Sequence, residues 1–98
     1  MDIIGKVRKE TLSVKIEGRI DAETSPELEE YLAGNTQGIK VIEFELKKLD
    51  YISSSGLRVF LRLKRSQDKD GYIVLKNMNE TVRAVFDVTG FSDMFIIK

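Results

Sequence analysis

The segment at residues 49–61, LDYISSSGLRVFL, constrains the fold more than any other part of the sequence. It begins as a short strand-like run, passes through three serines and a glycine, and continues as an apolar run with helical spacing. A strand that leads straight into a helix is typical of α/β domains. The serines stand where the free N–H groups and the dipole of the helix favour a negative charge. This turn could cap the helix, supply a nucleophile or receive a phosphoryl group.

Composition argues against a nucleophilic serine. The chain contains no His and no Cys, so it cannot form a Ser-His-Asp triad, a Cys-His pair or the usual zinc sites. The nucleophile-elbow pattern is missing as well, because no glycine lies two residues before any of the three serines. A serine activated by Lys47 or Lys48 stays open as an alternative. We predict a protein that is not an enzyme and that needs no metal and no cofactor.

Size and charge set the broad class. The chain has 98 residues, 42% of them hydrophobic and 33% charged, which fits a single globular domain over residues 1–98. Its 16 basic and 16 acidic residues cancel, which argues against nucleic acid as a direct partner. The N-terminus lacks the apolar core of a signal peptide, and no apolar run is long enough to span a membrane. With no cysteine, the expected location is the cytoplasm.

Apolar periodicity predicts the remaining elements. Strands are expected at residues 3–7, at 12–16 with an extension past Gly18 to Ile20, and at 39–46, 72–75 and 91–97. Helices are expected from Thr24 or Ser25 to Asn35, at 57–65, and from Asn77 or Asn79 to Gly90. The order is β-β-α-β-α-β-α-β. Strands that alternate with helices indicate an α/β fold with a mixed, mainly parallel sheet.

Three segments in this order resemble the STAS family, the domains shared by sulphate transporters and bacterial anti-sigma factor antagonists. Residues 18–22, GRIDA, are similar to the family's Gly-x-(Ile/Leu)-Asp element before the first helix. Residues 49–57 are similar to its phosphoacceptor turn, Asp-Ser-(Ser/Thr/Ala)-Gly-Leu. Residues 79–91 are similar to its closing helix and glycine stop. The resemblance covers nearly the whole chain and implies a small, single STAS-like domain.

The resemblance also implies a function and a site. The family's phosphorylated serine lies two residues before the glycine, which is Ser54 here, with Ser55 as the second choice; Ser53 stands where many members have Asp. The implied function is an anti-sigma factor antagonist that works by partner switching, with an anti-sigma factor that is also a serine kinase, and a phosphatase, as partners. The expected partner-binding residues are Asp21, Ser53, Ser54, Ser55, Gly56 and Arg58.

Other interpretations stay open. The domain could be a scaffold or accessory STAS subunit of a larger signalling or lipid-transport assembly, in which the serines are structural. It could also bind a nucleotide, although the sequence lacks a phosphate-binding loop of the Gly-x-x-x-x-Gly-Lys-(Ser/Thr) type. Within the turn, we expect Ser54 to project outward. Ser55, nearer the helix, is expected to contact backbone N–H groups or packed structure and to remain available as a cap.

Overall fold

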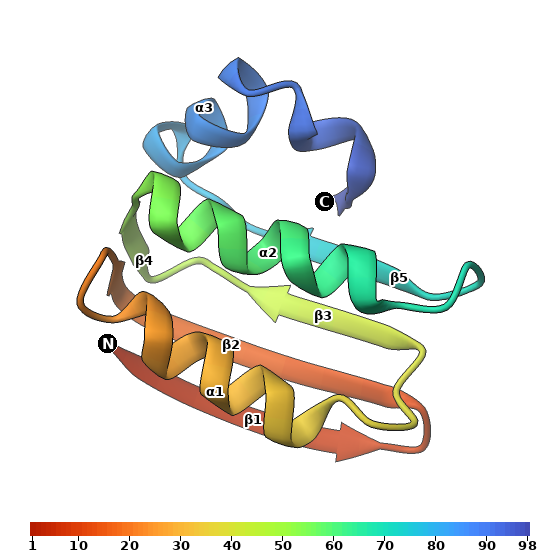
Figure 1. Cartoon of the computed structure of the whole chain (residues 1–98). Helices are drawn as coiled ribbons and strands as arrows, with labels where there is room; N and C mark the ends of the chain where they lie inside the picture. Colours follow the sequence, from red (N-terminus) through yellow and green to blue (C-terminus); the bar gives the residue numbers. More distant parts are fainter.

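A single mixed sheet of six strands organises the computed structural model, which describes residues 1–98 (Figure 1). The strands are β1 (Asp2–Arg8), β2 (Thr11–Ile20), β3 (Val41–Glu45), β4 (Leu49–Ile52), β5 (Tyr72–Lys76) and β6 (Ile96–Ile97). Their order is β1-β2-β3-β5-β6, and β4 pairs with β2. Only β1 runs antiparallel to its neighbour, so the predicted mixed, mainly parallel sheet is confirmed.

Three α-helices and one short 3-10 helix complete the chain. They are α1 (Ser25–Asn35), α2 (Ser54–Ser66), α3 (Glu80–Val88) and η1 (Phe91–Met94). In Figure 1, α1 and α2 lie side by side across one face of the sheet, and α3 lies near β4. None of these helices has the length and apolar character needed to cross a bilayer.

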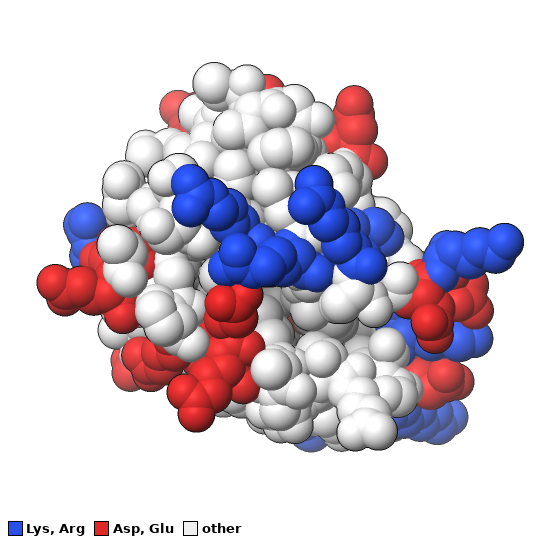
Figure 2. All heavy atoms as spheres, in the orientation of Figure 1, with Lys and Arg blue, Asp and Glu red and all other residues white.

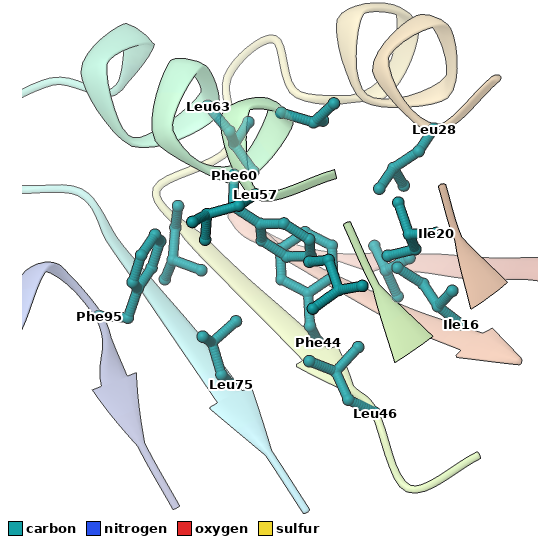
Figure 3. Close-up of a cluster of buried hydrophobic side chains, with 14 of the residues drawn as sticks. Ile16, Ile20, Leu28, Phe44, Leu46, Leu57, Phe60, Leu63, Leu75 and Phe95 are labelled. Atoms are coloured by element: carbon teal, nitrogen blue, oxygen red, sulfur yellow. The ribbon is translucent and has the colours of Figure 1, made fainter. Parts of the chain in front are cut away.

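The core lies between the helices and one face of the sheet. Leu12, Val14 and Ile16 of β2 are buried, whereas Ser13 and Lys15 between them are exposed, as the alternating pattern predicts. Figure 3 shows Phe60 of α2 pointing into this space toward Phe44 and Phe95. Its ring lies 4.8 Å from that of Phe44, 5.7 Å from that of Phe86 and 6.5 Å from that of Phe95, all edge to face.

The region after β3 differs from the predicted element order. Residues 49–52 form a strand of their own, so two strands rather than one separate α1 from α2. The reason is the length of β2, which has ten residues. Its first part pairs with β3 and its last part, Gly18–Ile20, pairs with β4. A turn that closes with a hydrogen bond from the Leu49 N–H to the Leu46 carbonyl separates the two partners.

The C-terminus also differs from expectation. The prediction of one strand over residues 91–97 is wrong, because Phe91–Met94 form η1 and only Ile96–Ile97 pair with β5. Gly90 adopts a left-handed conformation with φ 76°, which ends the preceding helix and redirects the chain. The 3-10 turn then brings Phe95 against Phe60 and Phe86. Burial of this aromatic ring takes precedence over a longer edge strand.

Candidate functional site

The serine turn lies where two parallel strands end side by side. Ile20 of β2 faces Ile52 of β4, and the Ser53 N–H donates to the Ile20 carbonyl at 2.8 Å. Because both strands run in the same direction, the segments that follow them start at the same end of the sheet, where the strands stop. The structure thereby brings together Asp21, which leads toward α1, and the three serines, which lead into α2.

The three serines take three different positions. Ser53 is the N-cap of α2: its backbone is extended, and its Oγ accepts a hydrogen bond from the Gly56 N–H at 3.2 Å. Ser54 and Ser55 are the first two helical residues, so α2 begins earlier than predicted. Because Ser53 accepts the capping hydrogen bond, Ser55 makes none to the backbone N–H groups, and its half-buried side chain fits the other environment predicted for it, packed structure.

Ser54 and Ser55 differ in exposure. Ser54 is exposed and Ser55 is half-buried. Neither hydroxyl makes a hydrogen bond within the chain, whereas Ser53 makes the capping bond. Ser54 therefore presents a hydroxyl to solvent beside the N–H groups of the first turn, which have no partner within the helix.

Gly56 holds the start of α2 against the sheet. It is buried, and a Cβ atom at this position would lie 2.5 Å from Cγ2 of Ile20 and 2.8 Å from Cγ1 of Ile52. Both distances are below any normal contact between carbon atoms. Gly56 is therefore required by the close approach of the helix to the ends of β2 and β4.

Asp21 shapes the neighbouring turn. Its Oδ1 accepts hydrogen bonds from the N–H groups of Glu23 and Thr24, both at 3.0 Å, and its own N–H donates to the Thr24 hydroxyl. The pKa of Asp21 lies below its usual value, chiefly because its carboxylate accepts the Thr24 N–H. The Glu23 N–H and the side chains of Thr24 and Arg19 lower it as well, whereas desolvation acts in the opposite direction. Asp21 thus lies beside the serine turn but makes no hydrogen bond to any of its serines.

A basic and an aromatic side chain pair with each other just before β2 and β4 end. The guanidinium carbon of Arg19 lies 4.6 Å from the centre of the Tyr51 ring, and its Nε lies 3.5 Å from Oδ2 of Asp21. Neither Arg19 nor Tyr51 was predicted from the sequence to be a site residue. Their pairing depends on the alignment of β2 with β4, since Arg19 faces Tyr51 in this register.

The outer side of α2 is basic. Arg58, Arg62 and Arg65 recur at helical spacing and are all exposed. Figure 2 shows a row of basic side chains over α2, with acidic side chains below it over α1. Arg62 pairs with Glu29 of α1, but Arg58 makes no ion pair within the chain. Arg58 is the basic residue of this row nearest to the serine turn in the sequence.

The surface around the serines is open. Four hollows exist on the surface, and none of them is lined by Ser53, Ser54 or Ser55. No group of three Asp or Glu side chains lies close enough together to hold a metal ion. An exposed hydroxyl on an open, partly basic surface fits a contact or modification site better than a substrate pocket.

Comparison with known proteins gives consistent results. The family model described as the STAS domain matches residues 2–98. The anti-sigma-B factor antagonist of Staphylococcus epidermidis is 34% identical over 87 residues, which cover 87% of this chain and 81% of that protein.

Solved structures share the fold. SpoIIAA, an anti-sigma factor antagonist, in its unphosphorylated form has a TM-score of 0.86 at 22% identity, covering 99% of this chain and 88% of that one. The Bacillus cell fate determinant SpoIIAA in its phosphorylated form has a TM-score of 0.77 at 20% identity, covering 99% of this chain and 91% of that one.

Proposed function

The chain belongs to the STAS domain family, and from this premise we propose that it is an anti-sigma factor antagonist that acts by partner switching. The observation that carries the proposal is the exposed Ser54 at the first position of α2, with no hydrogen bond inside the chain. The name of the Staphylococcus epidermidis relative supports the choice of partner class. In this role the protein binds another protein in the cytoplasm and catalyses no reaction itself.

The unmodified domain binds its anti-sigma factor through the two segments that follow the C-terminal ends of β2 and β4. The proposed contact residues are Asp21, Ser53, Ser54, Ser55 and Arg58, and the buried Gly56 contributes by holding the start of α2 in place. An anti-sigma factor held by this surface no longer holds its sigma factor. Since Asp21 and Ser53 are fixed by backbone hydrogen bonds, the surface is preformed and costs little ordering on binding.

Phosphorylation of Ser54 by the anti-sigma factor, acting as a serine kinase, ends the interaction. The phosphate adds about −1.5 to −2 charges at pH 7. In the free domain it faces water and the positive end of α2, which contributes roughly 0.3–1 kcal/mol. Against a partner it must lose water, at a cost of several kcal/mol unless it is paired. A net loss of about 3 kcal/mol weakens binding roughly a hundredfold, and a phosphatase resets the switch.

Ser54 is the proposed acceptor because its side chain is exposed, whereas Ser55 is half-buried and Ser53 caps the helix. Fragmentation mass spectrometry after incubation with the cognate kinase separates the three serines. Phosphate on Ser54 is the expected result. Phosphate found only on Ser55 would move the acceptor one residue along the turn.

A titration with the cognate anti-sigma factor tests the function itself. Ser54→Ala is expected to bind like the unmodified protein and to stay bound when the kinase and ATP are present. Ser13→Ala is the matched control, because Ser13 is an exposed serine on the open face of the sheet. It should be released by phosphorylation as the wild type is. Equal release of both variants would contradict Ser54 as the switch.

A scaffold role in a larger STAS assembly is the second candidate. The capping bond of Ser53, at a position where the family often has Asp, is the observation that favours it, since it gives one serine a structural use. This role requires stable complexes in which no serine carries phosphate. Intact-mass measurement of the protein isolated from its native cells distinguishes the two: one added phosphate supports the switch, and its absence in every growth phase supports the scaffold.

A further inference from the structure

The two edges of the sheet differ in length. At one edge, β6 offers only two residues, and at the other, β1 offers seven. Figure 1 shows no element beyond β1 at this edge. The outward N–H and C=O groups of β1 therefore have no partner in the sheet, and a long open edge can pair with another strand.

The β1 strand exposes apolar side chains. Ile4 and Val7 are 57% and 54% exposed, although they belong to a strand. At Gly5 a Cβ atom would overlap the Tyr31 hydroxyl, so this aromatic side chain lies directly over the strand. Ile3, Val7 and Tyr31 thus form an apolar surface on the helix side of the edge, and Ile4 forms one on the other side.

The ends of β1 carry opposite charges that the monomer leaves without partners. Asp2 and Arg8 make no ion pair within the chain, although six other pairs are present. Asp2 even faces Glu17 of β2, another acid, and Arg8 faces Thr11. Like charges on facing strand residues are unfavourable. A positively charged side chain from another molecule would offset the repulsion between Asp2 and Glu17.

We propose that β1 binds β1 of a second copy of this chain, antiparallel, about a twofold axis at Gly5. The two sheets then continue into each other, and each exposed apolar residue gains a neighbour. In this register Asp2 faces Arg8 of the second copy, Ile3 faces Val7 of the second copy, and Ile4 faces Lys6 of the second copy. Gly5 faces Gly5 of the second copy. The interface is isologous, so each facing pair occurs twice.

The register follows from the faces of the sheet and the charges. Facing residues must lie on the same side of the continuous sheet, which allows only shifts of two residues. A shift in one direction places Lys6 opposite Lys6 of the second copy. A shift in the other leaves Val7 and Arg8 without partners. The latter register also joins opposite charges, Asp2 and Lys6 of the second copy, but only the register centred on Gly5 pairs all seven residues of the strand.

The first test is a charge cycle measured by sedimentation velocity over a range of concentrations. The wild type is expected to form a dimer as its concentration rises. Asp2→Arg and Arg8→Asp alone each place two like-charged pairs in the interface, and each should weaken dimerisation about tenfold. The double variant Asp2→Arg/Arg8→Asp restores opposite charges and should return to within about threefold of the wild type.

The control for this cycle is the double variant Lys69→Glu/Asp93→Lys. Both residues are exposed, lie outside β1 and make no ion pair. This variant should dimerise like the wild type. A wild type that stays monomeric up to roughly 1 mM would overturn the proposal. A double swap that stays as weak as the single variants would overturn the register and the proposal with it.

The second test reads the register directly. The chain has no cysteine, so introduced thiols are the only ones present. Facing residues of adjacent strands bring their Cα atoms to about 4.5–5.5 Å, within the range of a disulfide. An oxidised mixture of Ile4→Cys and Lys6→Cys proteins should therefore give mainly the mixed disulfide. Predominant cross-linking of Ile4→Cys protein with itself would indicate the shifted register and contradict the proposal.

Discussion

Helices α2 and α3 begin in the same way and then differ. Ser53 and Asn79 are both N-caps with extended backbone, and each accepts a hydrogen bond from the N–H three residues on, at Gly56 and Val82 respectively. Beyond the cap, α3 has Glu80 in its first turn, whereas α2 has no acidic residue there. The dipole of α3 therefore meets a charge supplied by the sequence.

This difference explains what each helix start can do. At α3 the charge is permanent, and the Asn79 amide also donates to the Leu49 carbonyl at 3.1 Å, which ties the helix to β4. At α2 the first two helical residues are Ser54 and Ser55, which are neutral. Under the proposed function, the missing negative charge arrives with the phosphate and leaves with it. A similar geometry thus gives a fixed helix start in one place and a switchable one in the other.

The largest expected effect is on partner binding. Phosphorylation of Ser54 should weaken binding to the anti-sigma factor roughly a hundredfold, and Ser54→Asp should weaken it less, because a carboxylate brings one charge and a smaller group. The comparable change at α3 is Thr81→Asp, which adds a charge to a first turn outside the proposed surface. Calorimetric titration should show near wild-type affinity for Thr81→Asp. Equal losses at both helices would mean that any added charge, rather than the position, controls binding.

Stability should fall at the third residue of each helix, but for opposite physical reasons: an added methyl group at Gly56 and a lost side chain at Val82. Gly56→Ala places a methyl group against Ile20 and Ile52 and should cost about 1–3 kcal/mol of unfolding free energy. Val82 is fully buried, and Val82→Ala should cost about 2 kcal/mol through lost burial and a cavity. Urea denaturation measures both. A Gly56→Ala protein as stable as the wild type would show that α2 can move away from the sheet.

The caps themselves should contribute less. Ser53→Ala removes one hydrogen bond and should cost about 1 kcal/mol. Asn79→Ala removes the cap and the bond to Leu49, so the loss should be larger by about 0.5–1.5 kcal/mol. Ser54→Ala serves as the reference, because its hydroxyl makes no hydrogen bond within the chain. Thermal unfolding should rank Asn79→Ala below Ser53→Ala and leave Ser54→Ala near the wild type.

The smallest effect concerns Asp21 and the start of α1. Its pKa is lower in the folded chain than in the unfolded one, chiefly because it accepts the Thr24 N–H. Its contribution to stability is therefore fully present above the unfolded pKa and is lost as the pH falls through the lowered folded pKa. Asp21→Asn should be slightly less stable than the wild type at pH 7 and approach it as the pH falls, so that its stability curve is flatter in the acid range. An unchanged acid profile would show that the turn does not depend on the charge.

Local patterns were sufficient for several elements. The alternation of Leu12, Val14 and Ile16 predicted β2, and the start of α3 was predicted at Asn77 or Asn79, of which Asn79 is the cap. Both signals depend on neighbours a few residues away. Residues 49–52 had a strand-like sequence but were not counted as a separate strand, because β4 exists through its pairing with Gly18–Ile20, far earlier in the chain. The 3-10 turn at Phe91–Met94 was missed because it serves the burial of Phe95 among distant aromatic rings.

The features of the candidate site also separate into those set by local sequence and those set by long-range pairing. The order of residues is enough to place three hydroxyls at a helix start and to exclude activation by a histidine or cysteine, since both statements depend only on which residues are present and which are adjacent. Three features become visible only in the folded chain: Ser53 is the cap, Gly56 must lack a side chain, and Arg19 lies over Tyr51. Each of these depends on β2 and β4 ending side by side, and such long-range pairing depends on how the whole sheet packs, which no local pattern specifies.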